Sequence, residues 1–319
     1  MARDILIVGG GVIGLCTAYY CARRGDRVTL LDRNLEERDG LLVLCHSQHT
    51  LEEESNTAQQ ALQLGLPAQV FDARQTASMD PGVRMDVAGS VYFPMDCHLA
   101  PQRFIAGLQR QLNALGARFL WNTRVVDWRV SNRRIVAVVT NQGDFSADEY
   151  VLCGGAWSPE IAASLGLSLP MQAGKEYSLT LTRPRQMPRF CAILSEARVA
   201  VTPIGSSLRF AGTMEMAGMN EEINPVRVQG IMKAVVKYYP DFGPGDFAGI
   251  QPWCGLRPCS PDGLPYLGRF KNYDNLSTAT GDSMMGVSLG PVTGRLMAQL
   301  LAHDEPEIDV GLMAPDRFA

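Results

Sequence analysis

The sequence lacks a strong charge of one sign, a long apolar run free of glycine, and any paired cysteine motif. Its formal net charge is −4 over 319 residues. Its Lys and Arg residues form no run, so no nucleic acid partner is expected. The most apolar stretch lies near the start, but it contains Gly9, Gly11 and Gly14 and ends in Arg23 and Arg24. Such a stretch predicts neither a transmembrane segment nor a signal peptide.

The eight cysteines are scattered along the chain without a C-x-x-C pair, and most of them lie in apolar runs. This distribution predicts buried free thiols in a reducing compartment rather than disulfides or metal ligands. The four histidines are equally dispersed, so the sequence predicts no metal site.

What the sequence does have is three consecutive glycines after a short apolar stretch, in ILIVGGGVIGLCTAYYCARRGDRVTLLDR (5–33). Residues 5–8 suit a buried parallel strand, 12–24 a helix, and 27–31 a second strand that ends in Asp32. The glycines fill the G-x-G-x-x-G pattern, which lets a backbone turn approach a pyrophosphate at a helix N-terminus. Asp32 stands where a carboxylate binds ribose hydroxyls. The motif favours a dinucleotide but does not separate FAD from NAD.

The rest of the chain predicts strands at 40–45, 88–93, 118–121, 124–130, 135–140, 144–147 and 150–153, and helices at 50–64, 101–116, 226–238 and 294–302. The stretch between residues 172 and 212 reads as strand-rich. Helix-rich and sheet-rich blocks alternate without a low-complexity linker. This alternation predicts two interleaved domains.

Four stretches occur in a fixed order along nearly the whole chain: ILIVGGGVIG, YVLCGGAWS, PWCGLRPCSPDGLPYLGR and ATGDSMMGVSLGPVTGRLMAQLL. Together they resemble the D-amino-acid oxidase superfamily of FAD enzymes. The closest branch is bacterial D-amino-acid dehydrogenase, with glycine oxidase and hydroxyproline dehydrogenase as relatives. The resemblance implies an α/β fold, in which a FAD-binding Rossmann-like domain of the glutathione-reductase type is interleaved with an antiparallel-sheet substrate domain. It assigns residues 1–39, 96–168 and 250–319 to the FAD-binding domain, and residues 40–95 and 169–249 to the substrate domain.

The resemblance implies FAD as the cofactor and suggests which residues hold it. The pyrophosphate would lie at the glycine turn, the adenine against Val125 and Val126, and the flavin near Trp157. The N-terminus of the last helix would direct its positive dipole at the flavin N1–C2=O edge. The implied cofactor-binding residues are Gly9, Gly11, Val12, Ile13, Gly14, Asp32, Arg33, Val125, Val126, Gly154, Gly155, Trp157, Arg257, Met284, Met285, Gly286, Val287, Ser288 and Leu289.

The resemblance also implies a reaction. Arg257 matches the arginine that binds the substrate α-carboxylate, a role that suits a planar guanidinium. Tyr177 is a second catalytic candidate. The implied enzyme oxidises the Cα–N bond of a D-amino acid, or of a cyclic imino acid of the D-proline or hydroxyproline type. Hydride passes to flavin N5, and the imine is then hydrolysed to a 2-oxo acid. The electron acceptor is left open among quinone, dye and oxygen, as is a homo-oligomeric or hetero-oligomeric state.

The sequence departs from the family pattern in three places. Several dozen residues that usually follow the second strand are missing after Asp39. The usual T-G-H is replaced by Thr280-Gly281-Asp282, and Ala200 stands about where glycine oxidase has a tyrosine. These departures keep a second hypothesis open, in which the chain is a non-catalytic or subunit-dependent FAD-binding relative. The expected location is the cytoplasm, with peripheral attachment to the inner membrane left open.

Overall fold

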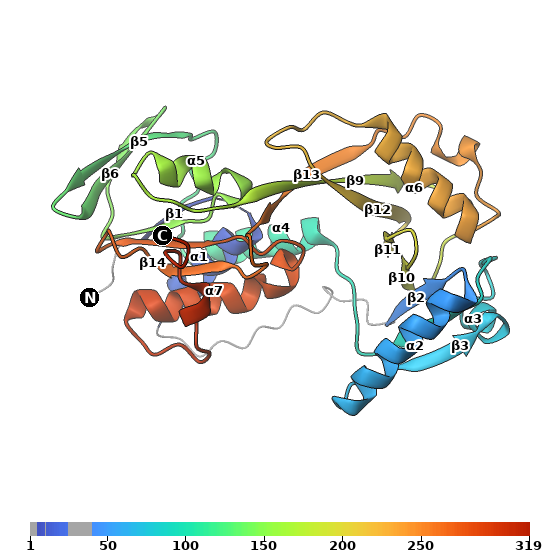
Figure 1. Ribbon diagram of the computed structural model, residues 1–319. Helices are drawn as coiled ribbons and strands as arrows, with labels where there is room; N and C mark the ends of the chain where they lie inside the picture. Colours follow the sequence, from blue (N-terminus) through green and yellow to red (C-terminus); the bar gives the residue numbers. More distant parts are fainter. Residues whose placement is uncertain (1–4, 10, 25–39) are drawn as a thin grey trace.

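The computed structural model describes residues 5–9, 11–24 and 40–319. One sheet has four strands in the order β1-β8-β15-β14 and lies at the left of Figure 1. β1 (Ile5–Val8), β8 (Glu149–Leu152) and β15 (Leu276–Thr280) are parallel, whereas β14 (Tyr266–Arg269) pairs antiparallel with β15. Every residue of β8 and β15 is buried, as expected of parallel strands that are covered on both faces.

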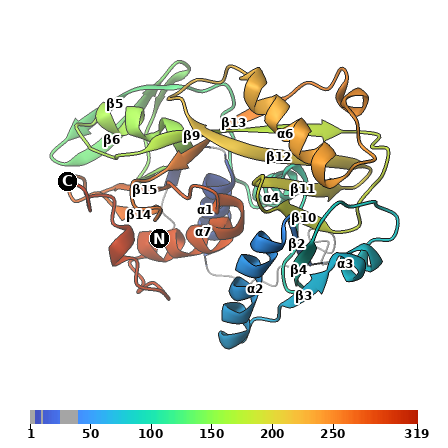
Figure 2. The ribbon, with the colours of Figure 1, turned by 45° about the vertical axis from the view of Figure 1, so that its right-hand side comes forward.

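Two glycines bring the helices α1 and α7 into close contact beside this sheet (Figure 2). A Cβ atom on Gly290 would lie 2.7 Å from Val12 Cγ1, and one on Gly294 would lie 2.5 Å from the carbonyl carbon of Cys16. The other side of α1 packs against α4 through Leu112 and its neighbours. The helices of this part are α1 (Val12–Ala22), α4 (Pro101–Ala114), η1 (Gly155–Trp157), α5 (Ser158–Ala163), α7 (Gly286–Ala302) and η3 (Gly311–Met313).

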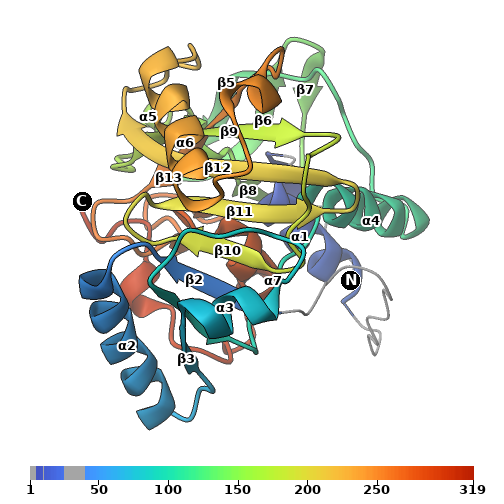
Figure 3. The ribbon, with the colours of Figure 1, turned by 90° about the vertical axis from the view of Figure 1, so that its right-hand side faces the viewer.

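The second sheet has eight strands in the order β13-β9-β12-β11-β10-β2-β4-β3, most of which can be followed in Figure 3. One face packs against α6 in the largest apolar core, which includes Leu179, Phe210 and Val235. The other face is covered by α2 at the β2 end, where Val43 and Ala58 lie in one cluster. The elements are β2 (Leu41–Cys45), α2 (Gln48–Gln63), β3 (Gln69–Asp72), α3 (Ala73–Met79), β4 (Gly89–Phe93), β9 (Gln172–Leu181), β10 (Cys191–Leu194), β11 (Val199–Ile204), β12 (Ser207–Met216), α6 (Pro225–Tyr238), η2 (Pro244–Phe247) and β13 (Trp253–Cys259).

A third, small sheet packs on the first through Trp128, Val138 and Tyr150. Its strands are β5 (Val125–Ser131), β6 (Arg134–Thr140) and β7 (Gly143–Phe145), in that order. The three sheets agree with the predicted α/β fold. The predicted domain boundaries stay a prediction. The segment 250–319 was assigned to the FAD-binding domain, yet β13, which lies in it, pairs with β9 in the large sheet.

The secondary structure differs from the sequence predictions in several places. Residues 118–121 are not a strand, because Phe119 and Trp121 instead stack on each other at 5.3 Å beside α4. The elements β3, α3, α5, β13, β14 and β15 were not predicted. α7 begins at Gly286 rather than at Gly294, and Pro291 lies inside it. The predicted strand at 27–31, with Asp32 and Arg33, lies outside the described residues.

All eight cysteines lie in the described part of the chain, and all are free thiols. The predicted burial holds for Cys16, Cys45, Cys153 and Cys191, whereas Cys97 is exposed and the other three are partly buried. Burial raises the pKa of Cys16, Cys45 and Cys153 to about 12, which keeps these thiols protonated and unreactive. Over residues 5–9, 11–24 and 40–319, no helix is both long enough and apolar enough to cross a bilayer.

We expect Gly294→Ala to destabilise the protein, because the new methyl group would overlap the backbone of α1. A lower urea midpoint should correspond to a loss of about 1–3 kcal/mol, the usual cost of overpacking. Gly230→Ala is the matched control, because Gly230 is exposed within α6 and an added Cβ would meet nothing within 4 Å. The control should leave stability unchanged or raise it by up to about 1 kcal/mol. Equal effects of the two changes would contradict the packing argument.

Candidate functional site

Three turns converge at one edge of the four-stranded sheet. They follow β1, β8 and β15, which are adjacent and parallel. The carboxyl ends of parallel strands meet at the same edge, which is where α/β sheets bind nucleotides. The turns carry three groups of predicted cofactor-binding residues: Gly9–Gly14, Gly154–Trp157 and Met284–Leu289.

The first turn has the close backbone contacts that require glycine. Gly9 has φ +116°, and a Cβ on it would lie 2.1 Å from the carbonyl oxygen of Cys153. A Cβ on Gly14 would lie 1.9 Å from the carbonyl oxygen of Gly9. A Cβ on Gly11, in contrast, would have no neighbour within 4 Å, and Gly11 caps α1 without a side-chain hydrogen bond. The turn therefore fits a pyrophosphate, because the space beside Gly11 is open and the first amides of a helix have no intrahelical acceptor.

Val12 and Ile13 are the first two residues of α1 and are partly buried. The predicted ribose ligand Asp32 and its neighbour Arg33 lie outside the described residues. Val125 and Val126 open β5, where the pairing with β6 skips Val126 in a bulge. A bulge leaves the backbone of the extra residue out of the ladder, which agrees with the predicted backbone contacts to an adenine.

The second and third turns expose apolar side chains toward solvent. Gly155 has φ +57°, and Trp157 at the end of η1 is 47% exposed. Met284 and Met285 are 64% and 50% exposed, and Val287 is 37% exposed. Met285 caps α7 without a side-chain hydrogen bond, and the Leu289 amide is the first to donate within the helix, to the Met285 carbonyl at 2.8 Å. The amides from Gly286 to Ser288 therefore lie at the positive end of the helix without an intrahelical acceptor. An exposed apolar rim around a free helix N-terminus suits a flat aromatic ring with a partly anionic edge.

Arg257 lies on the face of the large sheet that is opposite to α6. Its guanidinium forms an ion pair with Glu176 on the neighbouring strand β9. The two side chains are 32% and 18% exposed. The buried Nε of Arg257 has no hydrogen-bond partner among the described residues, so this guanidinium retains donor capacity for a ligand.

The strand that carries Arg257 leads directly to the third turn. The Ser283 amide donates to the Pro258 carbonyl at 3.0 Å, and Cys259 forms a β-bridge with Asp282. β13 also contacts η1. Arg257 therefore lies two residues before Cys259, which bonds to the turn that precedes α7.

Tyr177 is not brought to Arg257. It pairs with Cys254, whereas Arg257 pairs with Gly174, so the two side chains leave opposite faces of the sheet. The Tyr177 hydroxyl donates to Glu215, which also forms an ion pair with Lys175 at 3.1 Å. These hydrogen bonds, first of all the one from Tyr177, lower the pKa of Glu215 to about 2. Tyr177 is thus part of a buried polar network in the α6 core.

Three residues of the Arg257 face were not identified from the sequence: Glu176, Arg209 and Trp253. The pattern that could have revealed Trp253 is the two-residue period of a strand. Trp253, Gly255 and Arg257 are every second residue of β13, so their side chains must share a face of the sheet. Which strand lies beside β13 follows from long-range pairing, and the sequence alone does not provide it.

Asp282 is a buried carboxyl at the third turn. It is 4% exposed, and neither carboxylate oxygen accepts a hydrogen bond of good geometry from the described residues. Burial raises the pKa of Asp282 to about 6, against an ordinary value of 3.8, although nearby Thr293 offsets part of the effect. The predicted departure from T-G-H therefore creates a carboxyl that is costly to ionise next to the start of α7.

We expect Asp282→Asn to stabilise the protein at neutral and alkaline pH. Between about pH 4 and pH 6 the folded protein holds a proton that the unfolded chain has lost, so stability falls as the pH rises through this window. The amide removes this dependence. The free energy of unfolding at about pH 8 should rise by at most about 3 kcal/mol, and the gain should vanish below about pH 4.

The control for this pH dependence is Asp262→Asn. A hydrogen bond from Arg317 lowers the pKa of Asp262 to about 2, so its replacement should destabilise the protein at neutral pH. A gain for Asp282→Asn that is the same at all pH values would show that ionisation of the carboxyl is not the cause.

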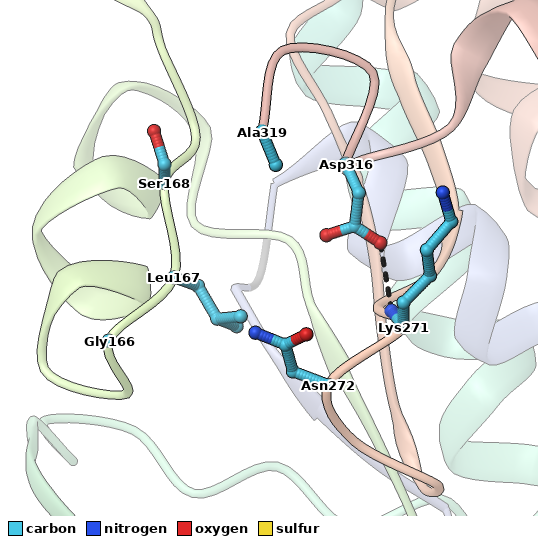
Figure 4. Close-up of a pocket in the computed structure, with 7 residues that line it drawn as sticks. All are labelled: Gly166, Leu167, Ser168, Lys271, Asn272, Asp316 and Ala319. Carbon is cyan, nitrogen blue, oxygen red and sulfur yellow. Dashed lines mark hydrogen bonds between the residues drawn. The ribbon is translucent and has the colours of Figure 1, made fainter.

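A pocket of about 370 Å³ lies away from these turns, between the α5–β9 connection and the C-terminal segment (Figure 4). Inside it the Lys271 amide donates to Asp316 Oδ2 at 2.8 Å. Its lining residues are Gly166, Leu167, Ser168, Lys271, Asn272, Asp316 and Ala319. None of the predicted site residues contributes to it.

Comparison with known proteins gives one consistent family. The family model described as DAO, FAD dependent oxidoreductase, matches residues 4–37 and 34–300. The chain is 31% identical over 293 residues to a D-amino acid dehydrogenase of Bradyrhizobium diazoefficiens, covering 89% of the chain and 68% of that relative. It is 31% identical over 260 residues to a D-amino acid dehydrogenase of Agrobacterium fabrum, covering 80% of the chain and 62% of that relative. The chain thus spans about two thirds of the length of these relatives.

The fold is similar to that of a glycine oxidase from Geobacillus kaustophilus, with a TM-score of 0.86 at 22% identity. The match covers 99% of the chain and 98% of that structure. The family model matches in two pieces that meet at residues 34–37. This break agrees with the prediction that a family segment after the second strand is shortened here.

Proposed function

The chain belongs to the DAO family of FAD-dependent oxidoreductases, and from this we propose that it oxidises the Cα–N bond of an amino acid or cyclic imino acid. The observation that carries the proposal is the link between the two halves of the site. β13 presents Arg257 on the open sheet face and then pairs, at Cys259, with the turn that starts α7. A guanidinium for the substrate and a helix N-terminus for the cofactor are therefore held by one strand.

FAD is the cofactor of this family, and the backbone of this chain fits it. The amides that follow Gly11 would bind the pyrophosphate, and Val125 and Val126 would contact the adenine through their backbone. Trp157 and the first turn of α7 would border the flavin. When bound, the flavin would accept one hydride, which carries two electrons. The dipole of α7 stabilises negative charge at the edge of the ring that it faces.

Arg257 binds the α-carboxylate of the substrate through its planar fork of N–H donors. In the ligand-free chain Glu176 occupies one of these donors. An incoming carboxylate competes with Glu176 for the guanidinium, and the substrate α-ammonium provides Glu176 with a new cationic partner. The pair thus orients an amino acid by both of its charged groups, which leaves the Cα–H bond as the part to be aligned with the acceptor.

The reaction balances with few protein groups. The α-ammonium first loses one proton to solvent, and the Cα–H bond then breaks with both of its electrons leaving as hydride, for which the flavin of this family would be the acceptor. A C=N bond forms from the nitrogen lone pair. Water adds to the resulting imine and releases ammonia and a 2-oxo acid. The residues of this chain contribute position and charge rather than a covalent intermediate, and the Arg257–Glu176 ion pair provides charges of both signs on this sheet face.

We expect Arg257→Lys to retain flavin but to lower kcat/KM for every amino-acid substrate about 10–100-fold, because the ammonium loses the bidentate geometry. The measurement is anaerobic flavin bleaching by both enantiomers of common amino acids and by hydroxyprolines, with quinone, dye and oxygen compared as acceptors. Arg227→Lys is the control, because Arg227 pairs with Glu215 on the α6 side of the sheet.

A holoprotein that stays oxidised with every amino and imino acid would refute the catalytic proposal. The second candidate, a subunit-dependent FAD-binding relative, is favoured by the two-piece family match and by the shorter span of the chain. In that case the protein would bind flavin tightly, and reduction would appear only after a second chain is added.

A further inference from the structure

We propose, on the basis of this proposed function, that the preferred substrate carries a second carboxylate, which Arg209 binds while Arg257 binds the α-carboxylate. The substrate class is a dicarboxylic amino or imino acid.

Arg209 lies on the same sheet face as Arg257. The register places Arg209 opposite Thr180 on β9, and Arg257 opposite Gly174. Both β9 positions are even-numbered in an unbroken stretch of the strand, so both arginine side chains leave the face opposite to α6. Arg257 is the end of this row nearer the cofactor turn, since its strand continues to the Asp282 bridge. Arg209 is the distal end, on the side to which a substrate side chain would extend.

The two arginines lean toward each other along the row. Arg257 reaches Glu176, which is two positions closer to Arg209 along β9. The guanidinium carbon of Arg209 lies 5.5 Å from the ring centroid of Trp253, which pairs with Ser178. The indole of Trp253 in turn lies across Gly255, because a Cβ there would be 2.3 Å from the ring. The two guanidinium groups thus face each other across Glu176 and Trp253.

Arg209 has donor capacity that the described residues do not use. Its Nε is buried and has no hydrogen-bond partner there. Burial lowers the pKa of Arg209, and the nearby Glu176 carboxylate only partly opposes this effect. A partly desolvated guanidinium without an acceptor is costly, and a carboxylate ligand would remove that cost.

The charges of the cluster match a dicarboxylic amino acid. Two guanidinium groups and one carboxylate give Arg209, Glu176 and Arg257 a net charge of +1. An amino acid with a side-chain carboxylate has two negative groups and one ammonium, so each of its charges meets an opposite one. A neutral amino acid would leave Arg209 covered but unpaired. We therefore expect the site to prefer an acid over its amide by about 10–100-fold, the usual effect of one charged hydrogen bond.

The test compares aspartate with asparagine and glutamate with glutamine, in both enantiomers, by anaerobic flavin reduction of the holoprotein. Wild type should favour the acid in kcat/KM. Arg209→Gln should lower the acid-to-amide ratio about 10–100-fold, whereas Arg209→Lys, which keeps the charge, should retain most of it. Arg227→Gln, on the other face of the sheet, should leave the ratio unchanged. Retained flavin and an unchanged circular dichroism spectrum will show that each variant is folded.

Ligand binding provides a second measurement that does not depend on turnover. Glutarate should change the tryptophan fluorescence of the wild-type holoprotein, and Arg209→Gln should weaken this binding at least about tenfold. An acid-to-amide ratio near one in wild type, or one that Arg209→Gln leaves unchanged, would overturn the inference. If no amino acid reduces the flavin, the proposed function fails, and glutarate binding alone then decides whether Arg209 recognises a second carboxylate.

Discussion

The site depends on one constraint, which is the approach of bare backbone to backbone at the start of the chain. Gly9 lies against the carbonyl of Cys153, and Gly14 lies against Gly9. These contacts hold the first turn beside the second, and the Gly294 contact brings α7 alongside α1. A side chain at any of these positions would separate the three turns. The cofactor site thus depends on glycines that have no side chain, and its hydrogen-bond donors are backbone amides.

The substrate half of the site follows a different principle. There the backbone provides a regular support, and the chemistry lies in long charged side chains on one face of a sheet. Small residues and the flat indole of Trp253 separate these charges. The opposite face of the same strands buries Tyr177 and Lys175 in a closed polar network with α6. One face is therefore fully satisfied internally, whereas the other keeps unused hydrogen-bond donors, as expected of a face that binds a ligand.

The sequence predicted best those features that depend on residues close together in the chain. The glycine turn, the free thiols and most strands and helices follow from short patterns such as residues 5–14. Arg257 was found through the family resemblance, but its partner Glu176 was not, because their contact depends on the pairing of strands about 80 residues apart. Tyr177 was predicted as a possible partner of Arg257 in the site, but the register of β9 and β13 places its side chain on the other face of the sheet. The start of α7 was predicted at Gly294 instead of Gly286, and the structure continues the helix through Pro291.

The pairing of β13 with β9 decides which side chains of β13 can contact a substrate, because alternate residues of a strand point to opposite faces of the sheet. Arg257 shares a face with Trp253 and Cys259 only because its position in β13 differs from theirs by an even number of residues. Loss or gain of one residue within this strand would turn the guanidinium into the apolar core behind α6. Point substitutions in β13 alter affinity, whereas single-residue insertions or deletions would invert the surface altogether. Lineages that share this site are therefore constrained to keep the length of β13 as strictly as its composition.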